Sequence, residues 1–184
     1  MINREKLAEG AYFTTVKGPY KRARLSVFLS APLSRGSQTE TALIPFMLER
    51  GTRLLPDKTL LGRRLLSLYG ADMESDYSQF AYSRVLSAYI SGADAGLLPE
   101  GERVLRERAS LLSELLFDTN APGGAFEEAQ LAIEKEKLRE TMRSIINSKR
   151  EYCFRRLMDT FYGEDLRSMP SDGFEEDLAG IDGA

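Results

Sequence analysis

The chain has 184 residues, of which 42% are apolar and 29% are charged, as is typical of a folded protein with its own core. Its 25 basic and 28 acidic residues give a net charge of -3, so it has neither the basic surface that nucleic acid requires nor a polybasic block for an anionic membrane. Histidine is absent and cysteine occurs once, which excludes imidazole-based catalysis, zinc sites with imidazole or thiolate ligands, and an intrachain disulfide.

The apolar runs of the chain are a few residues long, too short to span a membrane. Residues 1–10 contain no apolar signal core, and Cys153 is the single thiol. We therefore expect a cytoplasmic protein, and for Cys153 we expect a plain packing role.

The first half of the chain predicts two strands followed by two helices. Residues 11–16 are β-branched and aromatic, and in residues 22–31 apolar and polar side chains alternate. Residues 41–52 predict an amphipathic helix that ends at Gly51, with Thr39 or Thr41 as its cap and Pro45 in its early turns. A second short helix is expected over residues 56–71.

The second half predicts two strands and a set of longer helices. The strands are expected at residues 71–80 and 81–92, and a helix with a stripe of leucines at residues 98–118. Residues 127–161 contain neither proline nor glycine, so they predict one long helix or two with a bend. A short turn is expected near residues 175–178. Sequential strands without βαβ alternation indicate an α+β fold, with an antiparallel-rich sheet packed against helices and a single lobe over residues 1–184.

Several segments, in this order, resemble the pitrilysin/insulinase-type zinc metalloproteases. "ALIPFMLERGT" can be laid without a gap on the family's helix H-F-L-E-H-M-L-F-K-G-T, and "MLERGT" matches "MLFKGT". "LLSLYGA" resembles the family's "ESLGG", and "IEKEKLRETM" resembles "EREREVVLEEI". "SLYGADMESDYSQFAYSRVLSAYISG" and "EKEKLRETMRSIINSKREYCFRRL" are most similar to a non-catalytic bacterial branch, the YfmF-type members.

The family's catalytic residues do not carry over to this chain. The first zinc histidine falls on Ala42, the general-base glutamate on Pro45, the second histidine on Phe46, and the third ligand on or near Arg143. In the inverted zinc motif, two imidazoles hold the metal and a carboxylate activates its water, and alanine, proline and phenylalanine do neither. The resemblance therefore implies a pseudo-peptidase with no cofactor.

The resemblance also implies a peptide-binding edge strand, because active relatives pair substrate with a strand similar to "GGxxNA". That strand falls on residues 70–75, so Glu74, Ser75 and Asp76 are the candidate peptide-binding residues. The alternative is a solvated edge strand whose charges protect it from aggregation. For Glu134, Glu136 and Glu140, a remnant metal site is the alternative to charges on a helix surface.

Three functions remain open at this stage. The resemblance favours a non-catalytic subunit that supplies a peptide-binding or scaffold surface to an active zinc peptidase of the same family. The alternatives are a stand-alone adaptor that binds extended peptides by strand addition, and a metal-dependent peptidase supported by the family name only. Because family members repeat lobes of about this size, we also expect the chain to be the N-terminal lobe of a longer protein.

Overall fold

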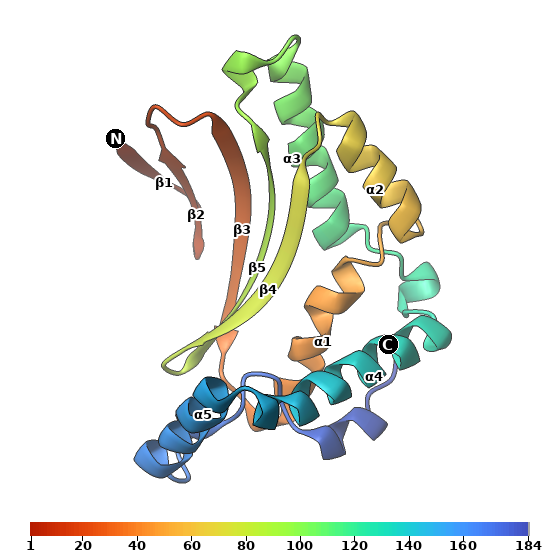
Figure 1. Cartoon of the computed structure of the whole chain (residues 1–184). Coiled ribbons are helices and arrows are strands. Elements are labelled where there is room, and N and C mark those ends of the chain that lie inside the picture. Colours follow the sequence, from red (N-terminus) through yellow and green to blue (C-terminus); the bar gives the residue numbers. More distant parts are fainter. Residues whose placement is uncertain (184) are drawn as a thin grey trace.

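A three-stranded antiparallel sheet forms the centre of the molecule in the computed structural model, which describes residues 1–183 (Figure 1). The strands β3 (Arg22–Pro32), β4 (Asp72–Phe80) and β5 (Ser83–Ala93) lie in the order β3-β5-β4. The long β5 pairs with both neighbours, and Ile90 is opposite Leu25 on one side and Met73 on the other. The strands predicted from residues 22–31, 71–80 and 81–92 are confirmed.

Side chains alternate between the two faces of this sheet, as the period of a strand requires. On β5, Leu86, Ala88 and Ile90 are buried, whereas the side chains between them are half-exposed. The buried face is covered by α1 (Gln38–Leu48), α2 (Lys58–Ser67) and α3 (Gly101–Phe117), all on one side of the sheet (Figure 1). The predicted α+β class with an antiparallel sheet packed against helices is therefore confirmed.

The N-terminal hairpin is a separate two-stranded sheet of β1 (Ile2–Ala8) and β2 (Ala11–Val16). It lies on the side of β3 away from the helices (Figure 1). Gly10 forms its turn with a φ of 74°, in the region that favours glycine. The strand β2 was predicted, but β1 was not, because residues 2–8 mix charged and apolar side chains on both faces.

The helix α1 begins and ends earlier than the sequence predicts. Its N-cap is Ser37, and Thr39 and Thr41 lie inside the helix, so the prediction that one of them caps it is wrong. Pro45 is the eighth of its 11 residues and not in the early turns. The shift has a tertiary cause: the buried Gln38 side chain is hydrogen-bonded to Tyr77 and to the carbonyl of Pro170, which holds residue 38 in the first turn.

The long helical region is two helices, α4 (Glu128–Ser144) and α5 (Lys149–Tyr162). A 3₁₀ turn at Ile145–Asn147 and the extended backbone of Ser148 separate them. Of the two predicted alternatives, the bent pair is the one formed. No residue of α5 is buried, and Cys153 on it is exposed, so the predicted packing role of Cys153 is wrong.

Two apolar clusters hold these elements together. One joins α1, α4 and the sheet, and the other joins α2, α3 and the sheet. The buried leucines of the two clusters are Leu43, Leu48, Leu86, Leu131, Leu138 and Leu178 in the first, and Leu61, Leu68, Leu111, Leu112 and Leu115 in the second. Within residues 1–183, none of the helices combines the length and the apolar character that a bilayer crossing needs.

Candidate functional site

The helix α1 carries the positions where the family resemblance expects metal ligands, and their side chains belong to the core. Ala42 and Pro45 are buried and Phe46 is half-buried. Ala42 belongs to the first apolar cluster, and Phe46 packs against it. None of these three side chains offers a donor atom to a metal. In the part of the chain that the structure describes, no group of three or more histidine, cysteine or acidic residues could hold a metal ion.

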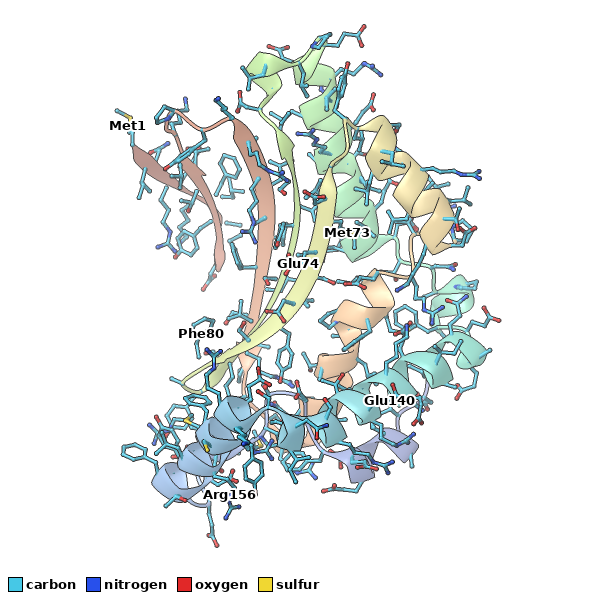
Figure 2. All side chains as sticks on the ribbon, in the orientation of Figure 1. Met1, Met73, Glu74, Phe80, Glu140 and Arg156 are labelled. Carbon is cyan, nitrogen blue, oxygen red and sulfur yellow. The ribbon has the colours of Figure 1, made fainter. Side chains whose placement is uncertain are left out.

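The fourth position, Arg143, lies exposed near the end of α4. Its Nε donates to Oε2 of Glu175 at 3.2 Å. This contact with the carboxylate raises the pKa of Arg143 and lowers the pKa of Glu175. Glu140, one turn before it, is exposed (Figure 2). The arginine therefore connects α4 to the C-terminal segment, which is residues 165–183.

Glu134 corrects the surface-charge interpretation of the α4 carboxylates. Its side chain is 1% exposed, and its Oε1 accepts from Arg50 Nε at 2.5 Å and from Lys137 Nζ at 3.0 Å. Glu136 and Glu140 are on the surface, as predicted. The Arg50–Glu134 pair thus links the end of α1 to α4, a connection that the helix pattern alone did not indicate.

The strand β4 is an edge of the three-stranded sheet, because among residues 1–183 it pairs with β5 alone. Glu74 projects from the outer face of the sheet (Figure 2), and Asp76, two residues on, is exposed on the same face. Ser75 lies on the opposite face, toward α1. Ser75 Oγ donates to the carbonyl oxygen of Pro45 at 3.0 Å. The three predicted residues therefore divide between the two faces, and the edge strand lies directly against the helix that holds the zinc motif in the family.

An aromatic contact on the outer face restrains Glu74. Its carboxylate accepts a hydrogen bond from Tyr89 on β5, and this bond raises the pKa of the tyrosine hydroxyl. The Arg24 guanidinium lies 3.3 Å from the centre of the Tyr89 ring. This stack across three strands holds the Glu74 carboxylate in place at the edge.

A buried polar network supports the far end of β4, and the sequence did not single it out. Arg84 Nη1 donates to the Ser37 carbonyl at 2.6 Å, and Gln38 Nε2 donates to Tyr77 Oη at 2.9 Å and to the Pro170 carbonyl at 2.7 Å. Burial raises the pKa of Tyr77. The alternation of Met73, Ser75 and Tyr77 on β4 indicates the buried face. The partners come from the start of α1 and from the C-terminal segment, and only the fold brings them there.

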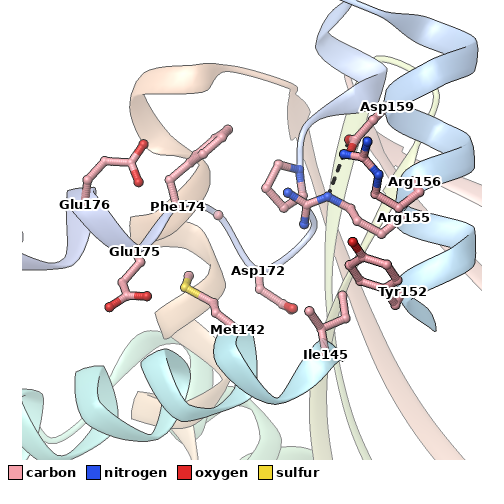
Figure 3. Close-up of a pocket in the computed structure, with 12 residues that line it drawn as sticks. Met142, Ile145, Tyr152, Arg155, Arg156, Asp159, Asp172, Phe174, Glu175 and Glu176 are labelled. Carbon is pink, nitrogen blue, oxygen red and sulfur yellow. Dashed lines mark ion pairs between the residues drawn. The ribbon is translucent and has the colours of Figure 1, made fainter. Parts of the chain in front are cut away.

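A hollow of about 340 Å³ lies between the end of α4, α5 and the C-terminal segment (Figure 3). Met142 and Ile145 line one wall, Tyr152 and Arg155 the second, and Asp172 projects from the third (Figure 3). Removal from water raises the pKa of Asp172, and the neighbouring Arg155 partly opposes this shift. On the α5 wall, Arg155 Nε lies 3.5 Å from Oδ1 of Asp159, so the two charges there are paired with each other.

Comparison with known proteins agrees with this fold. No family model matches the chain. Over 162 residues it is 26% identical to the "Probable inactive metalloprotease YmfF" of Bacillus subtilis, a match that covers 88% of this chain and 38% of that protein. This relative carries the name YmfF, whereas the sequence analysis named the branch YfmF.

Solved structures share the fold over almost the whole chain. A conserved protein from Enterococcus faecalis superposes with a TM-score of 0.90 at 24% identity, covering 99% of this chain and 43% of that one. The periplasmic protease PqqL from Escherichia coli superposes with a TM-score of 0.73 at 13% identity, covering 98% of this chain and 19% of that one. A "putative M16-like peptidase" from Alicyclobacillus acidocaldarius superposes with a TM-score of 0.66 at 10% identity, covering 98% of this chain and 40% of that one.

These likenesses confirm the predicted resemblance to a non-catalytic branch of the pitrilysin/insulinase-type metallopeptidases, and the fold is that of an M16-like peptidase lobe. The chain spans about two fifths of the length of the inactive relative and of the Enterococcus protein.

Proposed function

We propose that this chain is a catalytically inactive, metallopeptidase-like lobe that holds an extended peptide along the free edge of β4. The observation that carries the proposal is the Ser75–Pro45 contact of 3.0 Å, which fixes an unpaired edge strand against α1 while the motif positions on α1 carry Ala42, Pro45 and Phe46. A free edge offers backbone donors and acceptors to an added strand, and needs no metal to do so.

The charges on β4 indicate which peptides this edge would prefer. In an added strand, alternate side chains lie beside those that project from the outer face of β4, where Glu74 and Asp76 are exposed. Opposite charges side by side stabilise a strand pair and like charges destabilise it. A peptide with lysine or arginine at alternate positions is therefore the expected ligand.

A catalytic partner would supply the hydrolysis that this chain lacks. The inactive relative supports a non-catalytic subunit, and we propose an active peptidase with an intact H-x-x-E-H motif as the partner, in the cytoplasm of a bacterium. We also propose that residues 1–184 are one lobe of such an assembly. The alternative is a stand-alone adaptor, which the same free edge supports. Zinc-dependent activity of this chain itself is not proposed, because its motif side chains have no metal donors.

Native mass spectrometry of the full-length protein purified from its own cells tests the partnership. We expect a complex with a chain that carries H-x-x-E-H, and zinc in that chain. A solitary, metal-free protein that nevertheless binds peptide would contradict the partnership and support the adaptor.

Fluorescence anisotropy tests the edge itself, with labelled ten-residue peptides that carry lysine at alternate positions. A peptide N-methylated at its pairing amides should bind at least about tenfold more weakly, because it loses several backbone hydrogen bonds of about 1 kcal/mol each. Asp76→Lys should weaken binding of the lysine peptide, whereas Glu136→Lys, an exposed acid on α4, should not. Equal binding of the methylated and unmethylated peptides would exclude strand addition.

A further inference from the structure

A second hollow, larger than the one in Figure 3, continues the β4 edge beyond its last residue. It has a volume of about 810 Å³, within the range of roughly 300–1,000 Å³ that small-ligand pockets have. The turn between β4 and β5 meets α5 there, and Phe80, the last residue of β4, lies at that end of the strand next to α5 (Figure 2). We call it the α5 pocket, lined by Gln79, Ala81, Ile145, Phe154, Met158 and Tyr162.

The walls of the α5 pocket favour a neutral, apolar occupant. Most of the side chains that α5 and the β4–β5 turn contribute to the lining are apolar or aromatic, and the C-terminal segment adds Met169 and Pro170. The lining also holds Arg150 and Glu151, of opposite charge, and Arg155, which is paired with Asp159 at 3.5 Å. A third arginine at the border, Arg167, is already engaged, because its Nε and Nη2 donate to Asp165 at 2.9 Å each. The pocket therefore presents apolar surface without a net charge to attract an ion.

The protein itself leaves this apolar surface uncovered. Phe154 lines the pocket and is 61% exposed, and no residue of α5 is buried. The helix contacts chiefly the 3₁₀ turns at Ile145–Asn147 and Leu166–Ser168. The Gln79 side chain, which donates to the Arg167 carbonyl at 3.2 Å, fixes the C-terminal segment at the pocket's border.

We infer that the α5 pocket binds a bulky apolar side chain of the peptide that adds to β4. The inference rests on the proposed function, because the peptide reaches the pocket by following the edge. In an antiparallel pair, which is the more stable arrangement, a peptide runs opposite to β4. The N-terminal residues of the peptide then lie at the Phe80 end of β4. The apolar side chain that enters the α5 pocket therefore belongs to a residue that precedes the segment of the peptide paired with β4.

Anisotropy measurements on the whole chain test the inference with two peptides. Both carry the same alternate-lysine segment, and they differ in one preceding residue, leucine in the first and alanine in the second. We expect the leucine peptide to bind about tenfold more tightly, as burial of a leucine side chain allows. Met158→Trp, which fills the pocket, should remove the difference, and Phe154→Ala should reduce it.

Leu157→Ala is the matched control, because Leu157 is also on α5 and 58% exposed but does not line the pocket. It should leave the preference for leucine unchanged. Equal affinity of the two peptides for the unmodified protein, or an equal loss of preference in the Leu157 and Phe154 variants, would overturn the pocket and leave strand addition standing. Absence of binding by both peptides would overturn the proposed function together with the pocket.

Discussion

Individual buried charges connect elements of this molecule that are far apart in the sequence. Arg50 and Glu134 join α1 to α4, and Arg108 joins three elements by donating from Nη1 to the Ala93 carbonyl at 2.8 Å and from Nη2 to the Leu68 carbonyl at 2.9 Å. A buried charge is costly unless its partners remain in place. We therefore expect single substitutions at these contacts to have large effects on the free energy of unfolding.

The Arg50–Glu134 pair provides the first prediction. Glu134→Gln leaves Arg50 without its charge partner in the interior, and we expect the free energy of unfolding to fall by about 3 kcal/mol, measured by urea denaturation. Glu136→Gln is the control, because Glu136 is exposed, and it should change the free energy by less than about 0.5 kcal/mol. Equal effects of the two variants would show that the buried pair contributes no more than a surface pair.

Gly92 provides the second prediction at this scale. A Cβ at residue 92 would lie 2.4 Å from Nη2 of Arg108, and the guanidinium cannot withdraw without breaking its bonds to Leu68 and Ala93. Gly92→Ala should lower the free energy of unfolding by about 1–3 kcal/mol. Gly62→Ala in α2, where a Cβ meets nothing within 4 Å, should instead raise it by about 0.5–1 kcal/mol. Thermal melts of the two alanine variants should shift in opposite directions, and shifts of the same sign would contradict this account of Gly92.

At the scale of elements, charged contacts attach the C-terminal segment to the rest of the fold. Arg35 pairs with Asp177, and Asp177 Oδ2 accepts from Thr39 Oγ1 at 2.7 Å, while Arg143 pairs with Glu175. These donors lower the pKa of both acids. An acid whose pKa is lower in the folded state stabilises that state above its unfolded pKa of about 4.

This linkage predicts that acid loosens the segment. As the pH falls from about 4 through the lowered pKa values of Asp177 and Glu175, both acids are protonated and the contacts to Arg35 and Arg143 are lost. Hydrogen exchange of the amides at 174–179, corrected for the intrinsic rate, should be faster at pH 2.5 than at pH 6. Burial raises the pKa of Asp172, so protonation of Asp172 at low pH stabilises the folded state and opposes the effect of the other two acids. The comparison between pH 2.5 and pH 6 is therefore best made in an Asp172→Asn background. Unchanged protection in that background would contradict the role of the two acids.

At the scale of the whole molecule, the positions where the family resemblance expects metal ligands are packed into the core. Ala42, Pro45 and Phe46 on α1 pack into the core beside α4 and offer no metal donor, so we expect the fold to be independent of a bound ion. We expect the midpoint of thermal unfolding to be the same with excess zinc as with EDTA. A ligand present at 100 times its Kd would stabilise the protein by about 2.7 kcal/mol, which is several degrees at this chain length. A zinc-dependent rise of that size with one ion per chain would contradict the prediction.

Local patterns predict most of the elements, and their limits have physical causes. The alternation on β3 and β5 and the leucine stripe of α3 place these elements correctly, because burial of one face imposes the period directly on the sequence. The first strand of the hairpin and the start of α1 are missed. In β1 no face is buried, and at Gln38 a contact with the distant Tyr77 and Pro170 decides the helix start.

The sequence by itself determines that this chain has no imidazole and only one thiol, since residue types are read directly, and it determines the α+β class through its periodicities. Only the tertiary structure decides that Glu134 is buried, that Ser75 bonds to Pro45, and that a pocket follows the end of β4. The first two features join residues separated by 84 and 30 positions, and the pocket joins the end of β4 to α5 and the C-terminal segment. The sequence around one residue of such a contact carries no information about the distant residue that it contacts. The packing of the helices on the sheet therefore decides which residues come into contact.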